Sequence, residues 1–166
     1  TKGMVKNPLL TLGIPRVLNM YENFQFWYIL FSTCGIEVKK SARSTFKIYE
    51  SGLNTVMADN ICFPAKLVHG HVLDLVEKKV DRIFFPYVVY EELEPKSNNS
   101  YNCPVVAGYS DVLKSDINTK ERYNIPLDAP VINFKNDKLL MNSCRLYLTQ
   151  LLKDQYDEQI FQKAFA

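Results

Sequence analysis

The sequence predicts a doubly wound α/β domain, in which helices cover both faces of a mainly parallel sheet, as in flavodoxin-like and Rossmann-like proteins. Short apolar runs typical of buried strands alternate with longer segments of helical periodicity along the chain. The chain has 166 residues, the size of one ordinary domain, and 47% of them are hydrophobic, which supplies a core and excludes a disordered segment. We therefore treat residues 1–166 as a single α/β domain.

The first half of the chain supplies two strands, two helices and a short third strand. The apolar run at residues 9–14 predicts a buried strand that Pro15 closes. Asn19 can cap a helix over residues 20–33, which ends at Gly35 because glycine accepts the left-handed conformation that follows a helix. The shorter elements expected next are a strand at residues 36–38, a helix at residues 44–51 stopped by Gly52, and a brief strand at residues 56–57.

The second half continues the alternation. Pro64 fits the start of a helix over residues 64–79, and the apolar run at residues 82–85 predicts a strand. The polar segment at residues 91–100 predicts a surface loop. The elements expected after it are a helix from Pro104, a linker between Pro126 and Pro130, a strand at residues 131–134, a long helix after Asp137, and a helix at residues 157–166. Because Thr1 is not a natural start, we expect a fragment of a larger chain, with residues 157–166 opening a following domain.

Composition and charge exclude several classes of protein. The net charge is +2 with no concentrated basic stripe, so neither nucleic acid nor an anionic membrane is an expected partner. The longest apolar stretch, residues 24–34, is too short to span a bilayer, and no signal peptide is visible, so we expect a cytoplasmic protein. No Gly-rich phosphate loop is present, so the chain has no expected ATP site. The absence of a Cys-x-x-Cys pair argues against a closed zinc knuckle, and no Gly-x-Ser-x-Gly nucleophile elbow is present.

Cys62 stands at the most informative position. With a helix starting there, Cys62, Lys66 and His69 fall on one side, at spacings of four and three. The helix dipole and the Lys66 charge would favour a thiolate, the form that binds metals and clusters. Glycine is unfavourable in a helix interior, so Gly70 indicates that another backbone approaches closely there. His69 either lines this site or is solvated, whereas His71 is expected to be a hydrogen-bonded core residue.

Cys103 repeats the arrangement, because it precedes Pro104 at another helix start. Two such cysteines could converge at the carboxyl edge of a parallel sheet, where open α/β folds bind ligands. The alternative is that both thiols are small buried groups, the role we expect for Cys34 and Cys144 on apolar helix faces. Arg16, just past the first strand, could bind phosphate or form a surface ion pair.

Three segments resemble a known family: GIPRxLNMYEN from Gly13, CFPAKLVHGH from Cys62 and YNCPVVAGY from Tyr101. They resemble a domain of large proteins described as acyl-CoA dehydratase activases or CoA-substrate-specific enzyme activases. A more distant similarity connects the chain to subunits of 2-hydroxyglutaryl-CoA dehydratase, whose cysteines hold a [4Fe-4S] cluster. The resemblance implies that Cys62 and Cys103 are cluster ligands, that a further ligand lies elsewhere, and that this chain is not the ATP-driven activator.

Two functions of different classes follow. In the first, the domain is an enzyme component that holds a cluster for electron transfer or radical dehydration of a 2-hydroxyacyl-CoA, with Arg16, Lys66 and His69 as candidate lining residues. In the second, it is a non-catalytic docking or regulatory module whose cysteines only pack. A mononuclear metal site is a third alternative. The expected partners are the remaining domains of the parent protein and an acyl-CoA or a dehydratase, and the chain alone is expected to be inactive.

Overall fold

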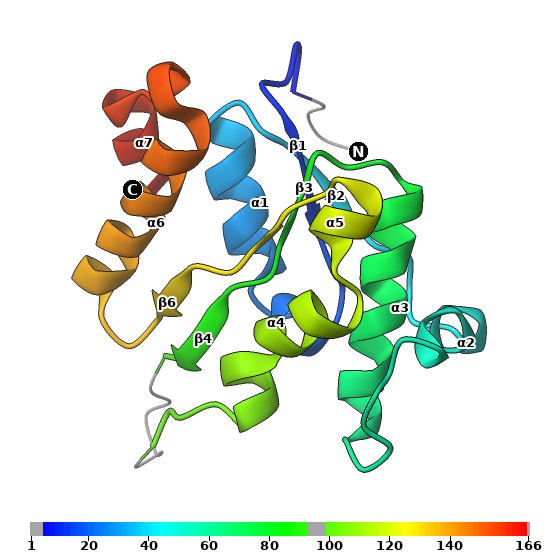
Figure 1. The fold of residues 1–166 in the computed structure, drawn as a ribbon. Helices are drawn as coiled ribbons and strands as arrows, with labels where there is room; N and C mark the ends of the chain where they lie inside the picture. Colours follow the sequence, from blue (N-terminus) through cyan, green and yellow to red (C-terminus); the bar gives the residue numbers. More distant parts are fainter. Residues whose placement is uncertain (1–4, 93–98, 166) are drawn as a thin grey trace.

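A four-stranded parallel sheet organises the protein, whose computed structural model describes residues 5–92 and 99–165 (Figure 1). The strand order is β2-β1-β3-β5, and every pairing is parallel, which confirms the predicted sheet. The order reverses direction next to β1, the place where doubly wound proteins leave a crevice at the carboxyl ends of the strands. The strands are β1 (Thr11–Ile14), β2 (Glu37–Lys40), β3 (Arg82–Phe84) and β5 (Leu127–Asp128).

A second parallel pair, β4 (Tyr87–Tyr90) with β6 (Val131–Asn133), continues from β3 and β5. Pro86 and Pro130 lie where the two pairs meet, and proline cannot donate to a strand ladder. The backbone still crosses this point, since the N–H of Tyr87 donates to the carbonyl of Pro130 at 2.9 Å. The prolines therefore divide a long paired ribbon into two short sheets.

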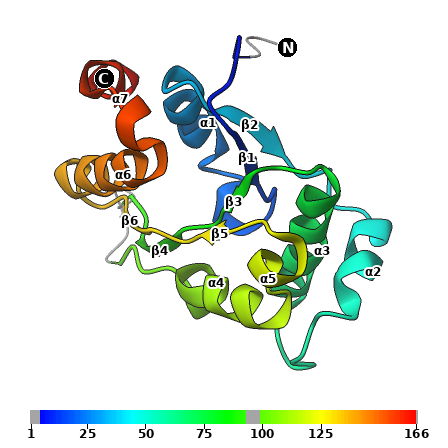
Figure 2. The same ribbon diagram turned by 45° about the horizontal axis from the view of Figure 1, so that its top comes forward.

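Helices cover both faces of the strands, which confirms the doubly wound class (Figure 2). On one side lie α1 (Phe24–Thr33), α6 (Asp137–Leu152) and α7 (Glu158–Phe165). On the other side lie α3 (Phe63–Glu77), α4 (Pro104–Asp116) and α5 (Thr119–Tyr123), with α2 (Phe46–Leu53) packed outside α3. Short 3-10 turns occur at η1 (Leu18–Met20) and η2 (Lys153–Gln155). Among the described residues, no helix is both long and apolar enough to cross a bilayer.

The core lies between the sheet and the helices. Trp27, Phe31 and Phe84 form an aromatic cluster with ring centroids 4.8 to 5.7 Å apart, and all three are buried. Cys34 and Cys144 lie in this core, as predicted, and burial raises the pKa of their thiols to about 11 and about 12 respectively.

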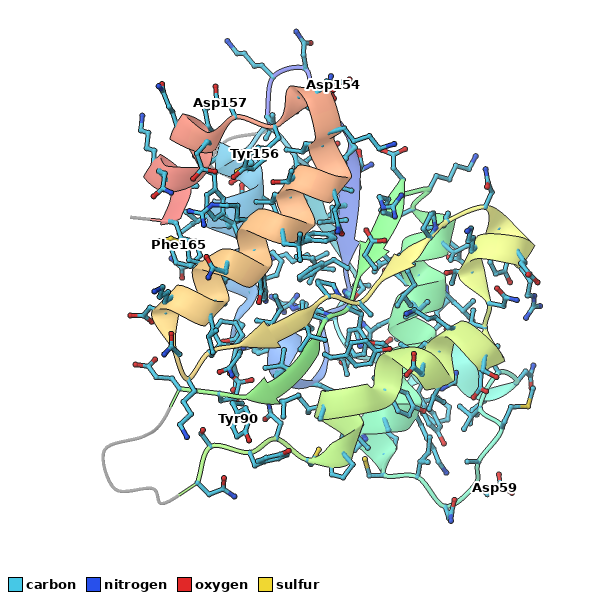
Figure 3. All side chains as sticks on the ribbon, turned by 60° about the vertical axis from the view of Figure 1, so that its left-hand side comes forward. Asp59, Tyr90, Asp154, Tyr156, Asp157 and Phe165 are labelled. Atoms are coloured by element: carbon cyan, nitrogen blue, oxygen red, sulfur yellow. The ribbon has the colours of Figure 1, made fainter. Side chains whose placement is uncertain are left out.

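The C-terminal helix α7 belongs to the packing of the same core. The ring of Phe165 lies 5.9 Å from that of Phe26 on α1, and Phe161 has no exposed surface. Figure 3 shows Phe165 on this helix, which follows the turn at Asp154, Tyr156 and Asp157. The expected following domain stays a prediction.

The close contact between α2 and α3 depends on two glycines. A Cβ on Gly70 would overlap the backbone oxygen of Ile48, and one on Gly52 would overlap the backbone nitrogen of Gly70. Only residues without a side chain allow the two helix backbones to approach this closely. The prediction of a close backbone approach at Gly70 is confirmed.

Several local features differ from the expectations. Gly52 does not stop its helix but lies inside α2, which runs to Leu53. Residues 56–57 form no strand, because the chain there turns from α2 towards α3 without a neighbouring strand to pair with. Asn19 does not cap α1, which begins at Phe24 after a separate 3-10 turn. The strand β4 and the short elements α5 and β5 were not expected, since they depend on pairing and packing partners far along the chain.

Candidate functional site

Cys62 and Cys103 occupy equivalent positions at the starts of neighbouring helices. Each is the N-cap residue, of α3 and α4 respectively, and the backbone angles are the same within one degree (φ −63°, ψ 154° and 155°). Neither side chain caps its own helix, and both thiols are exposed. Both helices begin at the end of the molecule towards which β4 points (Figure 1). Free N–H groups and the dipole at such a helix start favour a negatively charged sulfur.

Backbone pairing with β4 holds the segment before Cys103. Tyr101 forms an antiparallel bridge with Tyr90, which lies at the end of β4 (Figure 3). The N–H of Asn102 donates to the carbonyl of Val89, and its side-chain amide donates to the carbonyl of Val88, both at 2.9 Å. The residue immediately before Cys103 is thus fixed to β4 by hydrogen bonds from both its backbone and its side chain.

The carboxylate of Glu91 connects this anchor to the first sequence block. The amide of Asn102 donates to Glu91 Oε1 at 3.1 Å, and that of Asn19 donates to the same oxygen at 3.1 Å. Asn23 donates to both carboxylate oxygens, at 3.3 and 3.4 Å. Glu91 and Asn102 were not predicted as site residues, although the spacing of four between Asn19 and Asn23 and the place of Asn102 beside Cys103 were visible signals.

A buried hydrogen-bond chain joins α3 to α4. The Nδ1 atom of His69 lies 2.8 Å from the hydroxyl of Thr55, and its Nε2 atom lies 2.9 Å from the hydroxyl of Tyr109. Thr55 donates to the carbonyl of Gly52, so it accepts from His69 Nδ1–H, and the Tyr109 hydroxyl donates to Nε2. Burial lowers the pKa of His69, which favours the neutral ring. His69 has no exposed surface, so the alternative that it is solvated is wrong.

Tyr109 connects this chain to the cysteines. Burial raises the pKa of its hydroxyl to about 12, with smaller contributions from the neighbouring Asp116 and Cys62. Cys62 at the start of α3 therefore lies in the surroundings of a side chain of α4. Hydrogen bonds connect the three sequence blocks. Asn19 of the first block reaches Asn102 of the third through Glu91, and His69 of the second contacts Tyr109 of the third.

Lys66 and Arg16, the other predicted lining residues, are half-buried beside this edge. The ammonium of Lys66 donates to the carbonyl of Asp59 at 2.9 Å, in the turn ahead of α3 (Figure 3). Arg16 follows the end of β1 and packs its guanidinium over the ring of Tyr21, 5.3 Å from the centroid. A surface ion pair, one of the two alternatives for Arg16, is not among the salt bridges of the described residues.

The donor set suits part of an iron–sulfur site. Thiolates are the usual ligands of such clusters, and two exposed thiols stand at adjacent helix starts. Within residues 5–92 and 99–165, no group of three or more His, Cys, Asp or Glu side chains could hold a metal ion. Among the described residues, Cys62 and Cys103 are the exposed cysteines that could act as cluster ligands.

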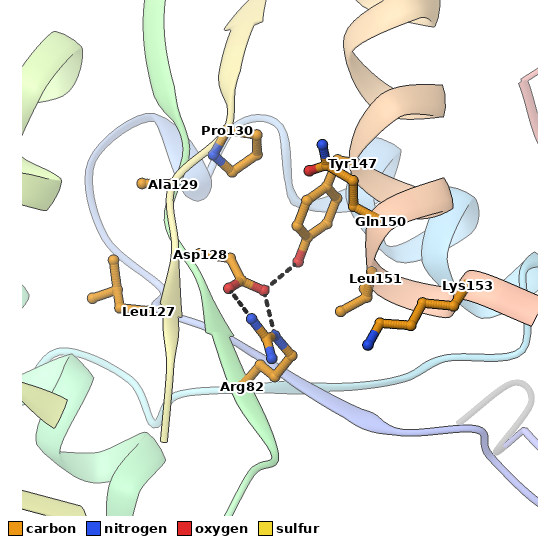
Figure 4. A pocket seen from close by; sticks show the side chains of 9 residues that line it. All are labelled: Arg82, Leu127, Asp128, Ala129, Pro130, Tyr147, Gln150, Leu151 and Lys153. Atoms are coloured by element: carbon orange, nitrogen blue, oxygen red, sulfur yellow. Dashed lines mark hydrogen bonds and ion pairs between the residues drawn. The ribbon is translucent and has the colours of Figure 1, made fainter. Parts of the chain in front are cut away.

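A separate hollow of about 610 Å³ lies between β5 and α6 (Figure 4). The guanidinium of Arg82 donates twice to Asp128, at 2.6 and 2.7 Å, and Tyr147 donates to the same carboxylate at 2.8 Å. Gln150 and Lys153 complete its polar wall. Because the central carboxylate is already satisfied by three donors, we interpret the arrangement as a structural brace between the sheet and α6.

Comparison with known proteins agrees with the resemblance seen in the sequence. A family model described as the CoA enzyme activase uncharacterised domain matches residues 11–166, which is nearly the whole chain. The chain belongs to this family. The match confirms the predicted resemblance to a domain of CoA enzyme activases. The comparisons with curated proteins and with solved structures found no match.

Proposed function

We propose that this CoA enzyme activase domain provides Cys62 and Cys103 as two ligands of a [4Fe-4S] cluster in a 2-hydroxyacyl-CoA dehydratase or activase system. The observation that supports the proposal is the paired geometry: two exposed N-cap cysteines with the same backbone conformation on helices that share the His69–Tyr109 contact. Further ligands would come from outside the described residues. A cluster bound there would supply one-electron transfer.

The residues around the two cysteines would orient the thiolates. The hydrogen bond between His69 and Tyr109 fixes α4 against α3, so the two helix starts keep their relative position. Asn102 fixes the backbone just before Cys103 through β4. Lys66, one turn after Cys62, adds positive charge near the sulfur and would offset the negative charge of a thiolate-ligated cluster.

The test is anaerobic reconstitution of the natural protein with iron and sulfide, followed by absorption and EPR spectra. We expect Cys62→Ser and Cys103→Ser each to lower the cluster content severalfold, and the double variant to abolish it. Cys34→Ala is the matched control, because this cysteine is buried in the core and cannot reach a surface cluster. Circular dichroism checks that each variant is folded.

Full cluster content in the folded double variant would reject the proposal. That result would instead favour a docking or regulatory module. The observation that supports this alternative is the exposed apolar surface beside Cys62, where Phe46, Met57 and Phe63 are 72%, 74% and 58% exposed.

A further inference from the structure

A second feature of the same sheet edge is a hollow of about 370 Å³ between the loops that follow β1 and β2. Its lining residues are Arg16, Tyr21, Arg43 and Ser44. The loops after the first two strands border the crevice where parallel α/β folds bind ligands. Its volume lies at the lower end of the range for small-molecule sites.

Both arginines have guanidinium groups free to bind. Arg16 is held by the ring of Tyr21 instead of by a carboxylate, and the described residues offer neither Arg16 nor Arg43 a salt bridge. Arg43 also borders a hollow that contains the carboxylates of Asp74 and Glu77, but neither forms a salt bridge with it in the described residues. Asp74 instead accepts from Lys78 at 2.7 Å and from the N–H of Ala42 at 2.8 Å. Two guanidinium groups therefore line one small hollow, and its lining residues include no acidic side chain.

The floor of the hollow presents a hydroxyl donor. The N–H of Arg16 donates to the Ser41 hydroxyl at 2.7 Å, and that hydroxyl lies 2.7 Å from Nδ1 of His71. Ser41 is buried and has no other acceptor among its bonds in the described residues, so its proton goes to Nδ1. The Nε2–H of His71 then donates to the Ser44 hydroxyl at 2.9 Å.

Because Ser44 accepts the hydrogen bond from His71, its own O–H is available to donate into the hollow. Burial lowers the pKa of His71 to about 4, in agreement with a neutral ring. Arg43 and Ser44 also lie just ahead of α2, whose first-turn N–H groups add partial positive charge. Arg16, Arg43 and the Ser44 hydroxyl thus all offer hydrogen-bond donors or positive charge to the hollow.

We propose that this hollow binds a phosphate group of a phosphorylated small molecule. Guanidinium groups match the spacing of phosphate oxygens and can bind them in pairs, and a serine hydroxyl adds a third donor. The fold does not require a second arginine at this hollow, because Arg43 is exposed and makes no ion pair in the described part of the chain. The inference does not depend on the cluster proposal.

Two sources of phosphate can be distinguished by calorimetric titration of the 166-residue chain with pyrophosphate, with coenzyme A, and with pantetheine, which lacks phosphate. We expect binding of at least one phosphate compound and none of pantetheine. Pyrophosphate binding as tight as that of coenzyme A would identify a free phosphate or diphosphate as the ligand. Tighter binding of coenzyme A would identify the phosphates of the CoA moiety.

The variants Arg16→Gln and Arg43→Gln should each weaken that binding about tenfold, the size of one lost charge-assisted contact. Arg122→Gln is the matched control, because Arg122 on α5 also packs over a tyrosine ring, 5.6 Å from the centroid of Tyr123. Within the described residues Arg43 is exposed and forms no salt bridge, so its variant keeps the test valid if Arg16→Gln disturbs the fold. Absence of binding by both phosphate compounds, or equal weakening by Arg122→Gln, would overturn the proposal.

Discussion

At the scale of single residues, the two histidines connect more elements of the fold than their spacing in the sequence indicates. They lie two apart on α3, yet both are buried and each bonds through both ring nitrogens. His69 joins α3 to α4, while His71 joins α3 to the loop after β2. The prediction of a hydrogen-bonded core histidine at position 71 is confirmed, and the structure extends the same role to His69.

Because His71 is buried as a neutral ring, the stability of the protein should fall with acidification. Its pKa is lowered from 6.5 to about 4, mainly by burial, so the unfolded state binds the proton more readily. The stabilisation is complete above pH 6.5 and is lost as the pH falls towards 4, by about 3 kcal/mol for this residue. Urea unfolding between pH 7 and pH 4 measures this change, with His71→Gln as the variant that lacks it.

We expect the wild type to lose more unfolding free energy than His71→Gln over that range. NMR titration gives an independent measurement, since the sequence has only two histidines. A His71 resonance that titrates near pH 6.5 in the folded protein would contradict the buried neutral ring.

At the scale of elements, glycine has opposite effects in two helices. Gly70 in α3 touches the backbone of α2, whereas Gly108 in α4 has nothing within 4 Å of the position a Cβ would take. We expect Gly70→Ala to destabilise the protein by about 2 kcal/mol or more, because the helices must move apart. Gly108→Ala should stabilise it by about 0.5–1 kcal/mol, through the better helix propensity of alanine.

The measurement is urea unfolding of the two variants under identical conditions. They make a matched pair, since each adds one methyl group to a helix interior. Equal changes in unfolding free energy would show that the α2–α3 contact does not require glycine at position 70.

The sequence predicted the elements that carry their own periodicity or caps. The parallel sheet, α3 from the Pro64 signal, α4 from Pro104 and the long helix α6 are all present. The elements it missed are short and depend on distant partners: β5 has two residues and pairs with β3, and β4 pairs with β6. Local propensity could not reveal such strands, because tertiary pairing decides them.

The candidate site divides in the same way. Cys62, Cys103 and Arg16 could be selected because a cysteine or arginine at the end of an element is visible in the sequence. Glu91, Arg43 and Ser44 could not, because their significance comes from partners that the fold brings near. Asn19 acts through a carboxylate 72 residues away, so the spacing of Asn19 and Asn23 could point to the two amides but not to Glu91 as their partner.

At the scale of the whole molecule, the packing sorts four chemically identical thiols into two classes. Cys62 and Cys103 are exposed at helix starts, whereas Cys34 and Cys144 retain only 8% and 1% of their surface. A thiol reacts as its thiolate, and burial has raised the pKa of the inner pair to about 11 and about 12. The inner pair can react only when the core opens.

Titration of the native protein with a thiol reagent should therefore show two fast groups and two slow groups. The fast pair should disappear in the variant that combines Cys62→Ser with Cys103→Ser, and the slow pair should become fast in denaturant. Because Cys144 lies on the buried face of α6, its reaction rate should follow global unfolding and not a local motion. Four slow thiols would show that the helix starts are covered, which would leave no open position for a cluster; four fast thiols would show that the core between α1 and α6 opens without global unfolding.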